Sequence, residues 1–251
     1  MSPPQATTAL ILAAGTGSRL MPLTADRPKV LVQIGGQSLL GGLLSTCEQL
    51  GMARIVIVTG YRHEAIDQWL AQHPPALPVT TVFNQAYAEL GNAWSVYVAR
   101  AELAGTDFVK LDGDLVLDGA IIEGLVASRW RSAIAIDTQG QLDAEAMKAV
   151  VDDDGRVHKM GKWLPLGESS GESIGVERIA AEHGPRLFAT IEHLVRQDGQ
   201  GDAYYEDAYH VMLEAGWELG AYDIGSSRWT EIDDARDLER ARSRHPRRSD
   251  G

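Results

Sequence analysis

Two cations near the N-terminus have a spacing that suits a charged ligand. Arg19 lies in a run of small residues, 12–20 (LAAGTGSRL), and Lys29 follows ten positions later, after Pro28. The apolar residues 9–12, where the run begins, are typical of a buried strand. In open α/β sheets the loop after the first strand binds nucleotides, because small residues let the backbone approach phosphates closely. We therefore predict that this loop holds a nucleoside triphosphate and that Arg19 and Lys29 bind its phosphates.

Two familiar phosphate-binding motifs do not describe this loop. The dinucleotide fingerprint requires a third glycine three positions after Gly17, where the chain has Leu20. The P-loop requires Gly-Lys-Ser/Thr, whereas Gly17 is followed by Ser18 and Arg19. A simple turn between strand and helix is the structural alternative for the glycines alone. The downstream proline-lysine pair favours the phosphate site.

Asp114 is placed to bind a metal ion. It follows the predicted strand 108–111 at its carboxyl end, so in a parallel sheet it shares an edge with the Gly-rich loop. Mg²⁺ prefers one or two carboxylates together with phosphate oxygens and waters. Asp112 lies two positions earlier, within the strand, and we expect Asp114, which follows Gly113 at the end of the strand, to be the metal ligand. An Asp-Gly turn without a metal is the alternative.

A second carboxylate, Asp233, comes directly before a helix expected at about 234–243. Capping that helix is its simplest role. If its segment lies beside the Asp114 strand, however, two carboxylates converge on one cation, as metal-assisted phosphoryl transfer requires. We therefore expect Asp114 and Asp233 to hold Mg²⁺ as the cofactor.

The middle of the chain offers groups for a second substrate. Lys148 and Lys162 flank a predicted hairpin in a chain with only five lysines. Glu172 and Glu206 supply carboxylates and Tyr205 an aromatic face, a combination that suits an ammonium group. Solvated lysines and a core position for Tyr205 are the alternatives. We predict that these five residues bind the acceptor.

The elements that must position these residues indicate an α/β fold. Strands and helices alternate over roughly the first 130 residues, and shorter strands with a hairpin turn at 152–155 follow. We expect a Rossmann-like, mixed, mostly parallel sheet with helices on both faces and a small β-rich acceptor-binding insertion. One domain, 1–251, would comprise a nucleotide half (about 8–130), an acceptor region (about 131–207) and a C-terminal closing segment (about 208–243).

Composition excludes several function classes. A net charge of −12 disfavours nucleic acid and anionic membranes as partners, and the basic cluster at 244–248 is a short tail expected to fray. The sequence has neither a run of 18 apolar residues nor an N-terminal segment resembling a secretion signal. The single cysteine, Cys47, falls on an apolar stripe, so we expect a packed thiol in a cytoplasmic protein.

Together these residues resemble the nucleotidyltransferase superfamily that makes activated sugars and alcohols. The match covers nearly the whole chain, through residues 12–20, 22–24 (PLT), 27–29 (RPK), 113–114 (GD), 231–233 (EID) and 237–238 (DL). A finer resemblance is to the small cytidylyltransferases that act on phosphocholine, inositol 1-phosphate or aminoalkylphosphonates. It rests on residues 91–95 (GNAWS), 146–148 (AMK) and 171–176 (GESIGV).

The resemblance implies that a phosphate or phosphonate oxygen of the acceptor attacks the α-phosphorus of CTP and releases pyrophosphate. Arg19 and Lys29 would stabilise the transition state, and no general base is needed because the attacking oxygen is already an anion. The residues implied to contact the nucleotide are Leu12, Ala13, Ala14, Gly15, Thr16, Gly17, Asn92, Ser95 and Asp112.

Two rival functions stay open. One is a sugar-1-phosphate nucleotidylyltransferase that uses UTP, dTTP, GTP or ATP. The other is a catalytically inactive nucleotide-sensing subunit, against which the joint presence of Arg19, Lys29, Asp114 and Asp233 argues. The sequence does not fix the oligomeric state, and a homodimer is an open alternative.

Overall fold

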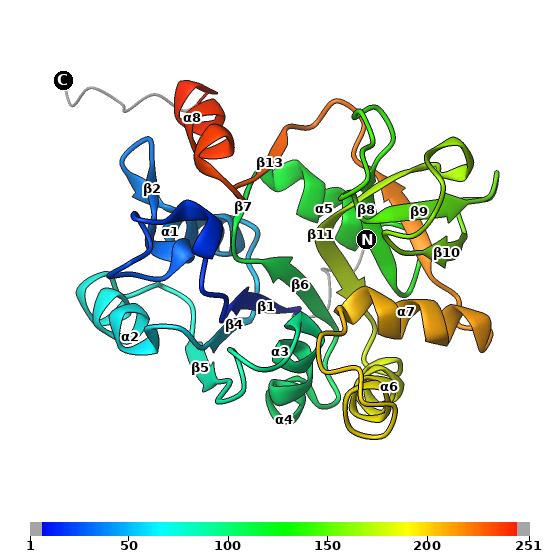
Figure 1. Cartoon of the computed structure of the whole chain (residues 1–251), viewed down its shortest axis with the longest axis horizontal. Coiled ribbons are helices and arrows are strands. Elements are labelled where there is room, and N and C mark those ends of the chain that lie inside the picture. Colours follow the sequence, from blue (N-terminus) through cyan, green and yellow to red (C-terminus); the bar gives the residue numbers. More distant parts are fainter. Residues whose placement is uncertain (1–6, 245–251) are drawn as a thin grey trace.

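The computed structural model describes residues 7–244, and a mixed sheet of nine strands runs through them (Figure 1). Its strands are β1 (Thr8–Ala13), β4 (Arg54–Thr59), β5 (Val79–Phe83), β6 (Phe108–Asp112), β8 (Ala133–Asp137), β9 (Lys148–Val151), β10 (Val157–Met160), β11 (Gly171–Ile179) and β12 (Gly220–Asp223). The main path has the order β10-β9-β11-β6-β1-β4-β5, while β8 pairs with β11 and β12.

The strands β6, β1, β4 and β5 form a parallel half in which β1 pairs with both β4 and β6. The strands β1, β4 and β6 are mostly apolar and buried because helices cover both faces of the sheet, whereas the edge strand β5 is partly exposed. The chain leaves β1 toward β4 on one side and later returns to β6 on the other. The carboxyl ends of β1 and β6 therefore flank the point where the strand order reverses, the usual place for a ligand in such sheets.

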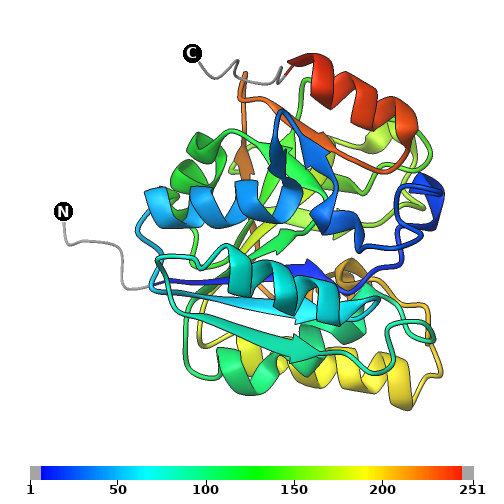
Figure 2. The same cartoon turned by 90° about the vertical axis from the view of Figure 1, so that its left-hand side faces the viewer.

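Helices pack on both faces of the sheet. They are α1 (Leu39–Gln49), α2 (His63–Gln72), α3 (Asn92–Val98), α4 (Arg100–Leu103), α5 (Gly119–Ala127), α6 (Gly184–Arg196), α7 (Tyr205–Glu214) and α8 (Ala235–Arg244). Alternate side chains of β1 enter two different cores: Ala9 and Ile11 join α1, α2 and α5, whereas Leu10 joins α3, α6 and α7. Figure 2 shows the light-blue α1 on one side of the dark-blue β1 and the yellow α6 on the other.

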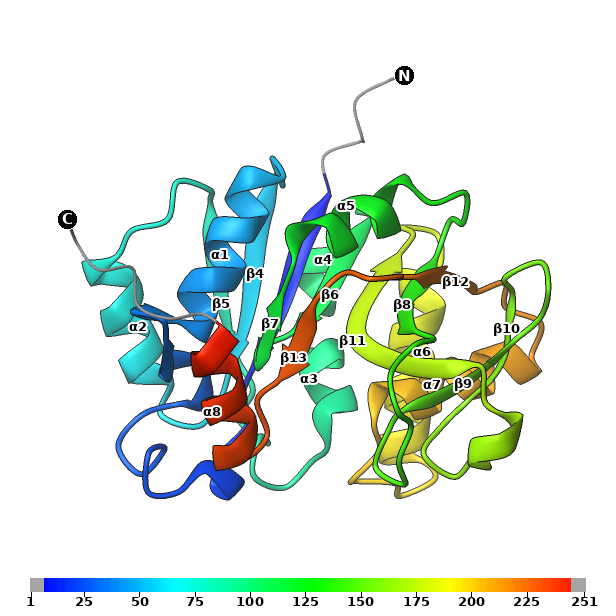
Figure 3. The same ribbon diagram turned by 90° about the horizontal axis from the view of Figure 1, so that it is seen from above.

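Short elements complete the edge where the parallel strands end. They are η1 (Ser18–Leu20), η2 (Lys29–Leu31), β2 (Gln33–Ile34), β3 (Gln37–Ser38), β7 (Leu115–Leu117), η3 (Leu166–Glu168) and β13 (Trp229–Glu231). The pair β7 and β13 was not predicted. These two strands run antiparallel and lie side by side (Figure 3). They bring the C-terminal segment to the end of β6.

The predicted fold class is confirmed. The hairpin turn predicted at 152–155 lies between β9, which ends at Val151, and β10, which begins at Val157. Residues 1–6 and 245–251 lie outside the described part of the chain. The tail predicted to fray at 244–248 therefore falls mostly outside it. No helix between residues 7 and 244 is long and apolar enough to span a lipid bilayer.

Candidate active site

The Gly-rich loop and the turn after β6 lie against each other at the edge where the parallel strands end. The Gly113 backbone N–H donates a hydrogen bond to the carbonyl of Leu12 at 3.0 Å. A side chain on Gly113 would collide with that carbonyl oxygen, so only glycine allows this approach. Gly17 adopts a left-handed conformation with φ 61°, and Thr24 Oγ1 donates to its carbonyl at 2.8 Å. The loop therefore has a defined shape beside Asp114.

Lys29 joins the two predicted metal ligands. Its Nζ lies 2.7 Å from Asp114 Oδ2 and 2.9 Å from Asp233 Oδ1. The exposed Arg19 guanidinium lies 2.9 Å from the same Asp233 oxygen. Burial alone would lower the pKa of Lys29, but the two carboxylates outweigh this effect and raise that pKa. The four residues predicted from positions far apart in the sequence thus form one cluster.

The carboxylates of this cluster fit a divalent cation. Asp114, Asp233 and Glu231 each offer an oxygen, and these oxygens lie within 4.8 Å of one another. Asp114 Oδ1 is buried without a hydrogen-bond partner, so it has a free lone pair for a metal. Desolvation and repulsion from Asp114 and Asp233 raise the pKa of Glu231 to about 8, which reflects a shortage of positive charge. Three carboxylates at this separation are a ligand set suited to Mg²⁺.

Asp233 is available for this cluster because its neighbour caps the following helix. The Asp234 carboxylate accepts hydrogen bonds from the backbone N–H groups of Arg236, at 2.7 Å, and Asp237, at 3.0 Å. The alternative that Asp233 serves as the cap is therefore wrong. Sequence reasoning missed Glu231, although its spacing of two from Asp233 indicates the same face of an extended chain.

A hollow of about 420 Å³ opens beside the cluster. It lies between the ends of β6 and β11 and the start of α7, and most of its charged side chains are acidic. Its lining comprises Arg19, Asn92, Asp112, Leu115, Asp143, Glu145, Ala146, Met147, Lys162, Glu172, Ser173, Ile174, Gly175, Tyr204, Tyr205, Glu206, Glu231 and Asp233. Seven carboxylates and only two cations face one space, so its field favours a positively charged group.

Two glutamates make the wall of this hollow unusual. Glu206 is 5% exposed, and its Oε2 has no hydrogen-bond partner. Burial, partly offset by Lys110, raises the pKa of Glu206 to about 8. Burial and repulsion from Asp143 and Asp137 raise the pKa of Glu172 to about 7. The neighbouring lysines do not outweigh burial at either carboxylate, and a ligand ammonium would add positive charge there.

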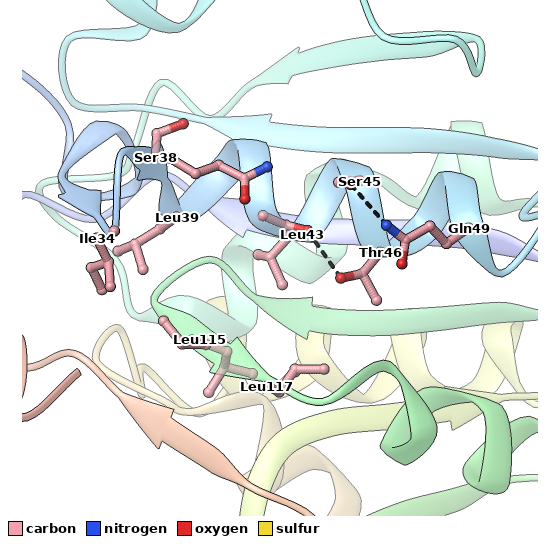
Figure 4. Close-up of a pocket in the computed structure, with 13 residues that line it drawn as sticks. Ile34, Ser38, Leu39, Leu43, Ser45, Thr46, Gln49, Leu115 and Leu117 are labelled. Atoms are coloured by element: carbon pink, nitrogen blue, oxygen red, sulfur yellow. Dashed lines mark hydrogen bonds between the residues drawn. The ribbon is translucent and has the colours of Figure 1, made fainter. Parts of the chain in front are cut away.

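A second, larger hollow of about 580 Å³ lies between α1 and β7. Figure 4 shows Leu43, Leu115 and Leu117 lining it, with hydrogen bonds from Gln49 to Ser45 and from Thr46 to the Gly42 carbonyl. None of its 13 lining residues is ionisable. It offers nothing that could bind a metal or balance phosphate charge, so the chemistry belongs to the acidic hollow.

The comparison with known families identifies the fold and its chemistry. Residues 8–141, about half of the chain, match the family described as nucleotidyl transferase. The chain belongs to the nucleotidyl transferase family. The predicted superfamily is thereby confirmed, and nucleotidyl transfer is the enzymatic activity of this fold.

Relatives of this nucleotidyl transferase include cytidylyltransferases. The CMP-5'-(3-aminopropyl)phosphonate synthase of Streptomyces rubellomurinus is 30% identical over 93% of the chain, which spans only 38% of that protein. The 2-aminoethylphosphonate cytidylyltransferase of Lancefieldella rimae is 25% identical over 92% of the chain and 90% of its own length. A UTP–glucose-1-phosphate uridylyltransferase of Haloferax volcanii is 24% identical over 86% of the chain and 87% of its own length.

A solved structure shows the same fold. The CTP:phosphocholine cytidylyltransferase of Streptococcus pneumoniae superposes with a TM-score of 0.75 over 95% of this chain and 99% of its own, at 22% sequence identity. The Rossmann-like sheet with additional antiparallel strands is thus shared by the two proteins. The resemblance to the small cytidylyltransferases is confirmed by these relatives and this neighbour together.

The residues predicted to bind nucleotide are divided between two places in this nucleotidyl transferase. Asn92 and Asp112 line the acidic hollow, whereas residues 12–17 are not among its lining residues and contact the turn after β6 through the Leu12 carbonyl. Ser95 is 5% exposed and accepts a hydrogen bond from Asn84 at 3.1 Å, away from the hollow. Asn92 is the first residue of α3. The cap is Gly91, and Asn92 Oδ1 accepts from the Tyr205 N–H at 3.0 Å.

Among the residues predicted to bind the acceptor, Lys162, Glu172, Tyr205 and Glu206 line the hollow. The structure does not bring Lys148 there. Its side chain is 1% exposed, and its Nζ donates to the backbone carbonyls of residues 143, 144 and 146 at 3.0–3.4 Å. A strand residue at that position points inward, and its ammonium is bound by its own loop.

Proposed function

We propose that this chain is a Mg²⁺-dependent cytidylyltransferase that transfers CMP from CTP to a small phosphorylated or phosphonate acceptor, releasing pyrophosphate. Within this class, we propose an acceptor with an ammonium head group. The observation that carries the proposal is the acidic hollow, which joins the Asp114, Glu231 and Asp233 cluster to a wall of tyrosines and buried glutamates. The cytidylyltransferase relatives named for aminoalkylphosphonates support it.

The wall matches an ammonium better than a neutral polyol. Glu206 Oε2 has no hydrogen-bond partner, and Glu172, Tyr204 and Tyr205 line the same hollow. A cation gains charge pairing with the carboxylates and cation–π attraction from the rings. Lys162 lies 4.9 Å from the centre of the Tyr204 ring and 3.6 Å from Glu145, so it is placed to bind an acceptor oxyanion.

The opposite end of the hollow suits the triphosphate. Arg19 and Lys29 would bind its phosphates and offset the negative charge of the transition state. In the reaction, an acceptor oxygen forms a bond to the α-phosphorus while the bond from that phosphorus to the bridging oxygen breaks. Asp114, Glu231 and Asp233 would hold Mg²⁺, which would supply positive charge to offset that of the phosphates during transfer. A cytoplasmic location, expected from the single cysteine, is part of the same proposal.

The second candidate is transfer of a nucleotide to a sugar 1-phosphate, favoured by the uridylyltransferase relative. A screen decides between them: pyrophosphate release is measured with CTP, UTP, dTTP, GTP and ATP. Each is combined with 2-aminoethylphosphonate, phosphocholine, inositol 1-phosphate or glucose 1-phosphate. We expect CTP with an amine-bearing acceptor to give the highest kcat/KM. Turnover only with glucose 1-phosphate would overturn the proposal, and turnover with no pair would support the inactive nucleotide-sensing subunit.

A further inference from the structure

A fully buried lysine lies behind the wall of the hollow. Lys110 on β6 has no exposed side-chain surface; its Nζ lies 2.8 Å from Glu177 Oε2 and 3.1 Å from Asp112 Oδ2. The same ammonium lies 3.7 Å from the centre of the Tyr205 ring. A buried ammonium needs partners because it has lost its water, and the partners here come from three different elements: β6, β11 and α7. Lys110 has no direct role in the proposed transfer of CMP.

The local sequence of β11 creates the room for this arrangement. Gly175 adopts a left-handed conformation with φ 76°, and the pairing of β11 with β8 shifts register between Ser173 and Glu177. A side chain on Gly175 would collide with Asp112 Oδ2, so a glycine bulge admits the Asp112 carboxylate. Beyond the bulge, Glu177 stands opposite Lys110 in the antiparallel pair of β11 and β6.

Asp112 connects this lysine to the acceptor wall. Its Oδ2 accepts a hydrogen bond from the Tyr205 hydroxyl at 2.7 Å as well as facing Lys110 at 3.1 Å. Tyr205 is the first residue of α7, and both Asp112 and Tyr205 line the hollow. One ammonium therefore holds together a carboxylate at the nucleotide end and a ring at the acceptor end.

We propose that Lys110 is a positioning residue for the acceptor. It holds the Asp112 carboxylate against the Tyr205 hydroxyl and so fixes the wall on which the acceptor's head group rests. The inference rests on the proposed function where it is tested by the acceptor KM. It does not where it is tested by the contact between Tyr205 and Asp112 in a crystal structure. The competing explanation is that Lys110 only neutralises the buried Glu177 and keeps the sheet stable.

A double variant separates the two explanations. Lys110→Met combined with Glu177→Gln removes both charges of the fully buried pair, while Asp112, which is partly exposed, loses its lysine. Glu177→Gln alone is the matched control, because Lys110 keeps Asp112 and the Tyr205 ring. Melting temperature, kcat and the KM values for CTP and acceptor are measured for the wild type, the double variant and Glu177→Gln. Tyr205→Phe, which keeps the ring and removes only the hydroxyl, serves as a second variant if the double variant does not fold.

If Lys110 positions the wall, the double variant melts near the wild type while its acceptor KM rises on the order of tenfold and its CTP KM stays unchanged. Tyr205→Phe gives a similar rise, and Glu177→Gln alone gives none. A double variant with both the melting temperature and the acceptor KM of the wild type would overturn the inference. A wild-type acceptor KM in Tyr205→Phe would overturn it as well.

A crystal structure of the double variant gives a readout that is independent of turnover. We expect the Tyr205 hydroxyl to leave Asp112, and an unchanged contact would overturn the inference. If the wild type releases no pyrophosphate with any acceptor, the proposed function fails, while this structure still decides the role of Lys110.

Discussion

Replacement of Glu206 by glutamine should stabilise the protein at high pH and weaken acceptor binding. The folded chain holds a proton on Glu206 up to its pKa of about 8, whereas the unfolded chain loses that proton near the usual value of 4.5. Between these pH values the folded state binds more protons, so the stability of the wild type falls as pH rises. Glutamine does not ionise and removes this part of the fall.

The size of the effect follows from the two pKa values. Each pH unit between 4.5 and about 8 corresponds to roughly 1.4 kcal/mol, which gives an upper bound of about 5 kcal/mol. Relaxation around the charge reduces this bound, so we expect Glu206→Gln to gain about 2 kcal/mol over the wild type at pH 9 and close to nothing at pH 5.

Urea unfolding of both proteins at pH 5 and pH 9 measures this difference. At pH 9, where Glu206 is ionised, the same variant should raise the KM of an amine-bearing acceptor on the order of tenfold, because one charged partner of the ammonium is lost. Stability and binding would then move in opposite directions, as expected of a residue kept for function. The reasoning would be refuted if the free energy of unfolding of the variant depended on pH as that of the wild type does. It would also be refuted if the variant were less stable than the wild type at pH 9.

Three further predictions follow from the metal cluster and its supporting turn. Lys29→Ala and Asp114→Ala should each lower kcat on the order of a thousandfold with an unchanged circular dichroism spectrum, and near-normal rates would remove the site assignment. Glu231→Gln should weaken Mn²⁺ binding on the order of tenfold in a paramagnetic titration. The control Asp234→Asn, which keeps the α8 cap, should bind Mn²⁺ as the wild type does. Equal affinities of the two variants would exclude Glu231 as a ligand. Gly113→Ala should cost about 2 kcal/mol and lower the melting temperature by about 4–8 °C, and an unchanged melting curve would show that the Leu12 carbonyl yields easily.

The parallel half of the fold was predictable because its signals are local. Residues 9–12 and 54–59 are apolar runs bounded by turn residues, as strands buried on both faces must be. The position of Asp114 after such a strand placed it at the ligand-binding edge. These inferences needed only the chemistry of neighbouring residues.

The remainder depends on contacts between distant segments. The pairing of Trp229–Glu231 with Leu115–Leu117 joins segments more than 100 residues apart, so Glu231 could not be placed next to Asp114 from either segment alone. Lys148 resembled any solvated lysine, and only the fold of its own loop buries its ammonium. Lys110 has Asp112 two positions later on the same strand, but nothing local shows that Glu177 of β11 is its second carboxylate partner.

The central claim is that one acidic hollow holds both halves of the product. A crystal structure with a bound CMP-linked amino acceptor tests it most directly. The account predicts the ammonium within hydrogen-bonding distance of Glu206 or Glu172 and the phosphates beside Arg19 and Lys29. A product whose head group lies outside this wall, or in the hollow between α1 and β7, would contradict it.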